Sequence, residues 1–298
     1  MKTFPFMQVD AFTNQPLAGN PCAILFDTDD LDAGTMLAVA KEMNLSETAF
    51  VRASATADFG VRYFTPAEEI PLAGHPTIAT VQALIDAGRL KLQGEKTAVT
   101  LELAVGVIQV EIQAQANQVM QIIMNQKKPQ FLREYTPEQV LPCFHLNKED
   151  MLPGAVIQTV STGTPQLMIP LKDKDALRRA SINPTEYTAL KAGGDFFSPH
   201  LFVLEGITQQ GDVFARHFGV PPDTMEDPFT GSATGGMSAY LWHYGLIDSP
   251  HLCVEQGHWM ERPGNAKVEV IGPRENIETV RVGGQAVVIL RGKINFNY

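Results

Sequence analysis

Two short blocks of the chain combine glycine, proline and polar residues in the same order. Residues 69–77 read EIPLAGHPT and residues 226–234 read EDPFTGSAT, so Gly74 and Gly231 stand at matching positions, 157 residues apart. A glycine at a helix start lets a ligand approach the unpaired N–H groups there, and the partial positive charge of that end attracts an anion. Two such starts facing each other predict a carboxylate site without Lys or Arg. The alternative is that both glycines serve only as turn residues.

Four polar side chains in or near these blocks are candidates for proton transfer or binding. His75 follows Gly74, where a helix start lowers the pKa of an imidazole and favours its neutral form; the alternative is a surface or capped histidine. Asp227 precedes a proline and is either a ligand contact or a turn and cap residue. Ser232 either caps a helix or donates its hydroxyl to a ligand. Glu47 separates a helix end from an apolar strand, which suits a general acid or base; the alternative is a charged strand terminus.

Several other chemistries lack their motifs in this sequence. There is no G-x-G-x-x-G and no G-x-x-x-x-G-K-[ST] loop for a nucleotide, and residues 231–235 (GSATG) differ from the G-x-S-x-G elbow of hydrolases. His251, Cys253 and His258 lie near one another but without the spacing typical of zinc ligands. We therefore predict no metal site and no cofactor.

Composition limits the class of partner. The 298 residues carry a formal net charge of −10, which argues against nucleic acid and anionic membranes as ligands. No run of eighteen apolar residues is present, and the first residues lack the apolar region of a signal peptide. Cys22, Cys143 and Cys253 are odd in number and far apart, which fits reduced thiols better than disulfides. Together these features predict a cytoplasmic protein.

Hydrophobic periodicity predicts an α+β fold with a duplicated half. The stretches 77–87 and 231–244 are apolar on all sides and predict two buried helices, and 32–43 predicts an amphipathic helix that ends at Asn44. Residues 125–153, with four prolines, are the predicted crossing between halves and contain a short helix near 137–141. Each half is predicted to be a curved, mostly antiparallel sheet around one apolar helix. Strands are predicted over residues 7–12, 21–26, 48–52, 60–64, 99–103, 106–112, 119–124, 156–161, 166–170, 197–204, 212–218, 264–271, 280–282 and 286–290.

The motifs along the chain resemble the PhzF family of phenazine-biosynthesis-like isomerases. The resemblance covers essentially the whole chain, and it implies the diaminopimelate-epimerase fold, with two pseudo-symmetric halves. In that family the last strands return to the first half, so we expect domains of residues 1–126 plus 284–298 and of residues 127–283. The motifs that carry the resemblance are VDAFT at 9–13, GNP at 19–21, SETAF at 46–50, GHPT at 74–77 and EDPFTGSA at 226–233.

The resemblance also implies roles for particular residues. The type member isomerises trans-2,3-dihydro-3-hydroxyanthranilate without metal or cofactor. By analogy, Glu47 is the acid/base that moves a proton between two carbons, and His75 and Asp227 hydrogen-bond the substrate and set its protonation. The substrate is expected to be a small carboxylate, and the protein a homodimer. The residues expected to bind that substrate are Asn20, Gly74, Gly231 and Ser232.

One departure from related enzymes of this fold narrows the reaction. Diaminopimelate epimerases and proline racemases use two opposed cysteines beside the repeat glycines, whereas this chain has Ala73 and Thr230 there. The comparison disfavours stereoinversion by a thiol pair and favours a proton shift through one base. Two other hypotheses stay open: an epimerase-type or other enzyme of the same fold with a different substrate, and a non-catalytic small-molecule binder.

Overall fold

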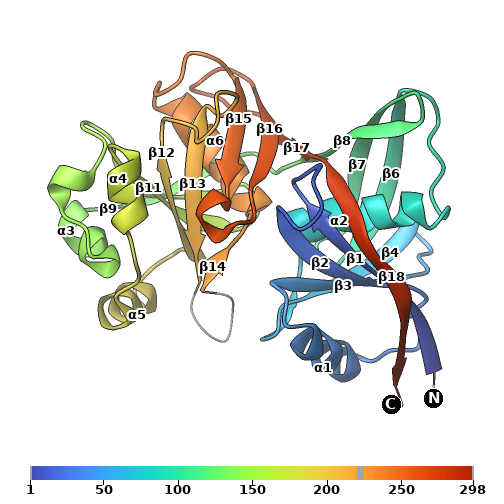
Figure 1. The fold of residues 1–298 in the computed structure, drawn as a ribbon. Coiled ribbons are helices and arrows are strands. Elements are labelled where there is room, and N and C mark those ends of the chain that lie inside the picture. Colours follow the sequence, from blue (N-terminus) through green and yellow to red (C-terminus); the bar gives the residue numbers. More distant parts are fainter. Residues whose placement is uncertain (1, 220–224, 297–298) are drawn as a thin grey trace.

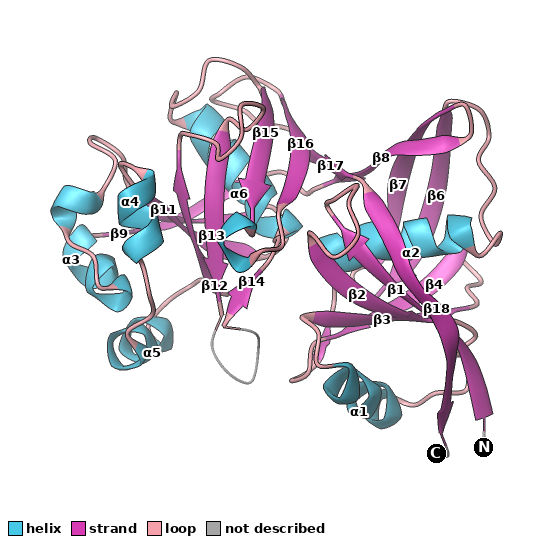
Figure 2. Cartoon of the chain, in the orientation of Figure 1, coloured by secondary structure: helices cyan, strands magenta, loops and turns pink. Residues whose placement is uncertain are grey.

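The computed structural model describes residues 2–219 and 225–296 and contains two lobes, each a curved sheet around a central helix (Figure 1). We call the part around α2 (Gly74–Asp86) the first lobe and the part around α6 (Gly231–His243) the second lobe. Figure 2 shows that strands dominate both lobes and that the shorter helices lie outside the sheets. The predicted α+β class with two sheets rolled around helices is confirmed.

The first lobe is built on β1 (Lys2–Ala11), which pairs antiparallel with β2 (Asn20–Leu25) and with β18 (Ala286–Phe296). β2 pairs in parallel with β3 (Glu47–Arg52), and α1 (Ala33–Met43) connects these two strands over the outer face. The other strands of this lobe are β4 (Phe59–Phe64), β5 (Glu69–Ile70), β6 (Lys96–Leu103), β7 (Gly106–Gln115) and β8 (Gln118–Asn125).

The second lobe repeats this plan around α6. Three short helices, α3 (Pro137–Val140), α4 (Lys174–Arg179) and α5 (Pro184–Ala192), cover its outer side, with 3₁₀ turns at Leu141–Phe144, Lys148–Asp150 and His258–Met260. Its strands are β9 (Gln130–Tyr135), β10 (Ile157–Ser161), β11 (Pro165–Pro170), β12 (Ser198–Val203), β13 (Val213–Phe218), β14 (Glu226–Asp227), β15 (His251–Gln256), β16 (Gly264–Ile271) and β17 (Thr279–Gly284).

Matching ion pairs in the two lobes reveal the internal repeat in atomic detail. In the β4–β5 hairpin, Arg62 binds both carboxylate oxygens of Glu69 at 2.7 Å. In the β13–β14 hairpin, Arg216 binds Glu226 in the same bidentate way, at 2.8 and 2.7 Å. Each arginine also lies over a phenylalanine of its own strand. Both hairpins therefore lead into their central helices with the same geometry.

The two central helices are surrounded by apolar side chains on every face. An amphipathic helix would show one polar stripe, whereas α2 and α6 bury most positions along their length, as the all-round apolar pattern predicts. Gly88 and Gly245 follow these helices with φ values of 68° and 66°, a conformation that suits glycine after a helix. α2 begins at Gly74, three residues before the predicted start at residue 77.

The lobes are joined by backbone pairing. β8 of the first lobe pairs antiparallel with β17 of the second, with Met124 opposite Val282, and β18 then returns the chain to β1. Figure 1 shows β8 and β17 running between the lobes and both chain ends on the first lobe. We keep the boundaries 1–126 plus 284–298 and 127–283 as a proposal for the two domains.

Some predicted elements differ from the observed ones. The short helix near residues 137–141 is confirmed as α3, and Asn44 ends α1 with a φ of 50°. The predicted crossing segment, however, contains strand β9, which pairs with β10. Strand β15 and helices α4 and α5 were not predicted, because their residues lack a regular hydrophobic period.

Two further sequence predictions concern the whole chain. Within residues 2–219 and 225–296, every helix is too short or too polar to cross a bilayer. Cys22, Cys143 and Cys253 are free thiols, as predicted, and the first two are buried.

Candidate active site

The starts of α2 and α6 meet where the lobes touch. A Cβ placed on Gly74 would lie 3.2 Å from Gly231 Cα and 3.3 Å from the backbone nitrogen of Ser232, so a larger residue here would press the two helix starts apart. The N-cap residues Ala73 and Thr230 make no side-chain cap bond to any described residue. By contrast, Asp32 caps α1 through the backbone N–H of Thr35 at 2.7 Å. The starts of the two central helices thus lie against each other, and neither is capped by the side chain of its N-cap residue.

Glu47 and His75 form a close pair at this point. Glu47 is the first residue of β3, and its Oε2 lies 3.3 Å from Nε2 of His75 in the first turn of α2. The Glu47 side chain is 19% exposed and that of His75 is 4% exposed. Burial lowers the pKa of His75 to about 3, so its imidazole is neutral at physiological pH. The predicted direction of this shift is confirmed, and its cause is the loss of water around the ring.

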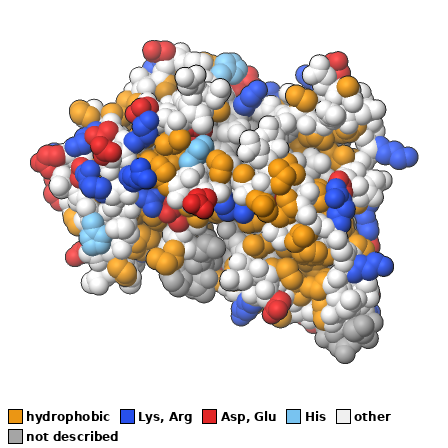
Figure 3. All heavy atoms as spheres, viewed as in Figure 1, with side chains coloured by type: hydrophobic (Ala, Val, Ile, Leu, Met, Phe, Trp, Pro, Cys, Tyr) orange, Lys and Arg blue, Asp and Glu red, His pale blue; other side chains and the backbone are white. Residues whose placement is uncertain are grey.

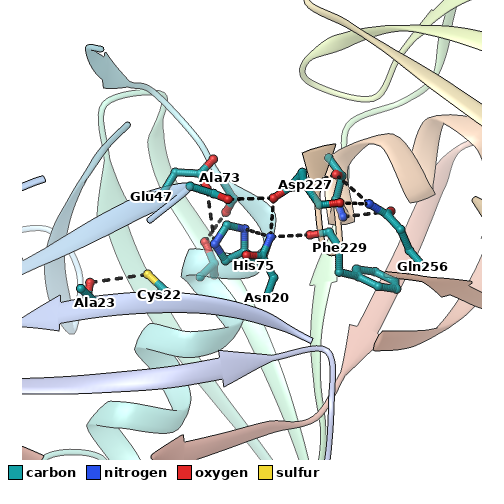
Figure 4. Close-up of polar contacts among 12 residues, drawn as sticks. Asn20, Cys22, Ala23, Glu47, Ala73, His75, Asp227, Phe229 and Gln256 are labelled. Atoms are coloured by element: carbon teal, nitrogen blue, oxygen red, sulfur yellow. Dashed lines mark hydrogen bonds and ion pairs between the residues drawn. The ribbon is translucent and has the colours of Figure 1, made fainter. Parts of the chain in front are cut away.

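Asn20 determines which nitrogen of His75 carries the proton. Its Nδ2 lies 2.7 Å from Asp227 Oδ1 and 2.9 Å from the carbonyl oxygen of Phe229, which fixes the amide orientation because both of these atoms accept hydrogen bonds. The same Nδ2 lies 3.1 Å from Nδ1 of His75. Because an amide nitrogen cannot accept a hydrogen bond, Nδ1 of His75 is the nitrogen without hydrogen, and Nε2, 3.3 Å from Glu47 Oε2, carries it (Figure 4).

Asp227 bridges the lobes through its carboxylate. It lies in the second lobe, yet it accepts hydrogen bonds from Asn20 and from Ser46 Oγ of the first lobe, the latter at 2.9 Å. Thr230 Oγ1 also donates to it, at 2.5 Å. Burial raises the pKa of Asp227, although the three hydrogen bonds oppose that effect. Gln256 holds the backbone beneath it by donating to the Asp227 carbonyl oxygen at 2.6 Å. A carboxyl of this kind holds a proton at higher pH than an exposed one.

Phe12 packs between the lobes directly behind the glycines. Its ring stacks on Phe229 with centroids 4.3 Å apart, and its φ of 62° is rare for a large side chain. Cβ atoms added to Gly231 or Gly284 would lie 2.9 Å and 2.4 Å from this ring. Both glycines therefore leave room for the Phe12 ring. Gly231 packs against this ring in addition to starting α6.

Gln126, where the chain leaves β8, supports the start of α6. Its Nε2 donates to the carbonyl oxygen of Gly231 at 2.8 Å, and its Oε1 accepts from Thr162 Oγ1. A Cβ on Gly235 would collide with this amide, at 1.8 Å from Oε1. The crossing segment thus positions the second helix start as well as connecting the lobes.

The structure brings the predicted site residues together. Asn20, Glu47, His75 and Asp227 form one connected group, and Gly74, Gly231 and Ser232 lie at the adjoining helix starts. The alternative readings of Asp227 and Ser232 as helix caps are wrong, since the N-cap position belongs to Thr230 and carries no side-chain cap. Residues that the sequence analysis gave no role are Ser46, Thr230 and Gln256, which all contact Asp227. Ser46 lies inside the motif at 46–50 and Thr230 inside the motif at 226–233, so the sequence carried a signal for both of these residues.

Other parts of the described chain differ in character from this site. Among residues 2–219 and 225–296, no group of three His, Cys, Asp or Glu side chains is close enough to hold a metal ion. A groove of about 400 Å³ lies between β7 and β8 of the first lobe and β15 to β17 of the second, lined by residues that include Gln121, His251 and Arg281. This groove contains none of the predicted site residues.

Sequence comparisons place the chain among isomerases. The family model described as phenazine biosynthesis-like protein (PhzC-PhzF) matches residues 9–292. The protein named uncharacterized isomerase YfhB of Bacillus subtilis is 31% identical over 273 residues, covering 91% of this chain and 92% of that protein. Trans-2,3-dihydro-3-hydroxyanthranilate isomerase of Pseudomonas aeruginosa is 30% identical over 290 residues, covering 97% and 98%.

Solved structures agree with the fold. The PhzF-family phenazine biosynthesis protein of Bacillus anthracis superposes with a TM-score of 0.88 at 31% identity, covering 99% of this chain and all of that one. A hydroxyproline epimerase of Agrobacterium vitis superposes with a TM-score of 0.65 at 12% identity, covering 98% of this chain and 92% of that one. At that identity the second likeness concerns the fold alone.

Proposed function

The chain belongs to the PhzF family of phenazine biosynthesis-like proteins and is an isomerase, and from this premise we propose a cofactor-independent proton shift between two carbons of a small carboxylate substrate. Glu47 is the acid/base in this proposal. The observation that carries it is the Glu47–His75 pair, 3.3 Å apart beside two uncapped helix starts. A base and an anion-binding surface lie together there, as such a reaction requires.

The uncapped helix starts supply the carboxylate site. The backbone N–H groups near Gly74, Gly231 and Ser232 belong to the first turns of α2 and α6, where intrahelical acceptors are lacking. Two helix ends converging on one point reinforce each other electrostatically. A substrate carboxylate bound there would place its neighbouring carbon atoms close to the Glu47 side chain.

In this proposal Glu47 alone removes the proton and returns it. Glu47 takes a proton from one substrate carbon, and the electron pair left behind shifts along the adjacent double bond. The same carboxyl then returns the proton to a second carbon on that side of the substrate. His75 lies with Nε2 3.3 Å from Glu47 Oε2 and stays neutral, so it does not compete with the carboxylate for the proton. Asp227 lies beside this pair, held by hydrogen bonds from Asn20, Ser46 and Thr230.

The substrate class follows from the characterised relative. The Pseudomonas aeruginosa relative is named for trans-2,3-dihydro-3-hydroxyanthranilate, a cyclic acid that carries an amino and a hydroxyl group. We propose a substrate of that kind for this chain. Ala73 and Thr230 occupy the positions beside Gly74 and Gly231, so a pair of thiols is absent from those two positions and a one-base reaction is favoured.

Solvent exchange tests the proposal directly. The chain is incubated in D₂O with trans-2,3-dihydro-3-hydroxyanthranilate, and deuterium at carbon is followed by NMR. Wild type should isomerise the acid and exchange the migrating position, whereas Glu47→Gln should abolish both. Glu42→Gln, on the exposed face of α1, is the matched control and should behave as wild type. Full activity of Glu47→Gln would rule out the assigned base, and binding of the acid without exchange in wild type would favour a non-catalytic binder.

The predicted homodimer also stays a proposal. Figure 3 shows apolar side chains gathered over the part of the first lobe where β1 and β18 run, and Leu290 of β18 is 51% exposed. Such a surface fits a contact between copies of the chain. Light scattering should give twice the 32.6 kDa chain mass; a monomer at micromolar concentration would refute it.

A further inference from the structure

The second lobe buries a connected group of polar side chains on the face of its sheet that lies against α6. We call Gln166, Ser198, His200 and His217 the polar cluster; the side chains lie on β11, β12 and β13. Ser198 Oγ lies 2.8 Å from Gln166 Oε1 and 2.8 Å from His217 Nε2, and Nδ1 atoms of the two histidines lie 3.2 Å apart. Each member is less than a tenth exposed.

The strand registers show where this cluster stands relative to the first lobe. In the first lobe Glu47 pairs with Cys22 across the parallel strands β2 and β3. In the second lobe Ser198 pairs with Gln166 across the parallel strands β11 and β12. Ser198 therefore occupies the position in the second lobe that the proposed base occupies in the first.

The neighbouring strands extend the correspondence. His200 stands opposite His217 where the first lobe has Ala49 opposite Tyr63. His217 in turn stands opposite Asp227 across β13 and β14. Directly opposite residues of an antiparallel pair project to the same face with their Cβ atoms about 5 Å apart. The cluster therefore begins beside the carboxyl that bridges the lobes.

The first lobe also shows that the fold does not require imidazoles here. Ala49 and Tyr63 fill the matching positions, and Tyr63 satisfies its hydroxyl with Thr77 Oγ1 at 2.8 Å. His200, by contrast, is 0% exposed, and its Nε2 has no hydrogen-bond partner among the described residues. A buried polar atom without a partner costs about 1–3 kcal/mol. At these matching positions the second lobe therefore carries a polar atom that is unpaired within the described chain, where the first lobe has none.

The hydrogen-bond directions specify what Ser198 offers. Gln166 Oε1 can only accept, and it faces both the backbone N–H and the hydroxyl of Ser198. The Ser198 hydroxyl therefore donates its hydrogen to Gln166 Oε1, and the Nε2–H of His217 donates to Ser198 Oγ. His217 Nδ1 then accepts from His200. This arrangement leaves one lone pair on Ser198 Oγ for a donor from outside the cluster.

We propose that Ser198 is a specificity-determining contact of the second lobe, which accepts a hydrogen bond from a hydroxyl or amino group on the carboxylate substrate. His217 and Gln166 are positioning residues that orient its oxygen. The proposal rests on the proposed function, since it needs a substrate carboxylate bound at the helix starts. It adds the expectation that the second lobe binds a polar substituent of the substrate, while Glu47 of the first lobe transfers the proton.

Probe pairs separate this contact from a structural role. Affinities of benzoate, 2-aminobenzoate and 3-hydroxybenzoate are measured by calorimetry for wild type, Ser198→Ala, His217→Met and His217→Gln. Ser198→Ala and His217→Met should weaken at least one substituted probe by about three- to tenfold and leave benzoate unchanged, which is the size of one hydrogen bond. His217→Gln keeps an N–H donor and should restore most of the affinity. Tyr63→Phe, at the matching position of the first lobe, is the control and should change none of the three.

The outcomes distinguish the two proposals. Equal weakening of benzoate and the substituted probes, or no change in any of them, overturns the Ser198 contact while leaving the carboxylate site and deuterium exchange intact. Failure of benzoate to bind wild type, together with absence of exchange, overturns the proposed function and the contact with it. If Ser198→Ala does not fold, Gln166→Met removes the partner that orients the hydroxyl and should give the same selective loss.

Discussion

Acid should unfold this protein through the histidines that it encloses in neutral form. Burial lowers the pKa of His75 and of His217 to about 3, and burial together with its neighbour His217 lowers that of His200 well below 6.5. In the unfolded chain each of these rings takes up a proton as the pH falls through 6.5. Folding stability from these three groups is therefore present above pH 6.5 and lost progressively below it.

One substitution makes the effect measurable. His217→Gln removes a group that binds one proton in the unfolded state and none in the folded state between pH 6.5 and about 3. Linkage gives about 1.4 kcal/mol per pH unit for one such group, so the variant should retain about 2.5 kcal/mol more of its own neutral-pH stability than wild type does at about pH 4.5. The pKa values of Asp10 and Asp227 are raised in the folded state, which increases stability as the pH falls. Wild type and His217→Gln share this effect, so it cancels in their comparison.

The assay is urea unfolding followed by tryptophan fluorescence at several pH values between about 7 and 4.5. His251→Gln, which changes an exposed histidine, is the matched control and should lose stability in parallel with wild type. The reasoning would be refuted if His217→Gln also followed the wild-type slope, because the ring would then be charged in the folded state.

Three further substitutions test the site and its support. Gly74→Ala places a Cβ 3.2 Å from Gly231 Cα, so it should separate the helix starts and lower kcat/KM in the exchange assay by about tenfold or more. Phe12→Ala removes the ring stacked on Phe229 and should lower the free energy of unfolding by about 3–5 kcal/mol in urea. Asn20→Leu removes the amide that contacts both lobes and should lower kcat by about 10- to 100-fold, measured by the same exchange.

Matched controls exist for two of these changes. Gly193 has no atom within 4 Å of an added Cβ, so Gly193→Ala should keep wild-type activity; equal activity of Gly74→Ala would contradict the proposed approach of the helices. Phe197 is 47% exposed, so Phe197→Ala should cost much less stability than Phe12→Ala. For Asn20→Leu, unchanged kcat with a raised KM would assign the amide to substrate binding alone.

The part of the fold that sequence could predict is the part with a strong local signal. The helices α2 and α6 have all-round apolar sequences, and the shared offset of Gly74 and Gly231 predicted that the two halves repeat. Helix α5 carried a signal that was overlooked, since Asn183 caps it and Pro184 follows in the first turn. Strand β15 had no such signal, because its place depends on pairing with β16.

The candidate site was predictable where a motif names the residue and unpredictable where the contact crosses between lobes. Asp227 receives hydrogen bonds from Asn20 and Ser46, which precede it by about two hundred residues. No periodicity encodes such a pairing, since it depends on how the lobes dock. The pairing of His200 on β12 with His217 on β13 could not be predicted either, because it depends on the register between the two strands.

The internal repeat bears on whether the reaction uses one base or two. A reaction that inverts a carbon centre needs a base on each side of it, and a duplicated fold can supply two by keeping the same residue in both halves. Here the matching positions have diverged: Glu47 in the first lobe corresponds to Ser198 in the second, and Ala73 and Thr230 stand beside the two glycines. A serine hydroxyl is a poor base at neutral pH, but it is a good hydrogen-bond partner. This asymmetry favours a division of roles in which the first lobe transfers the proton and the second lobe binds the substrate by hydrogen bonding.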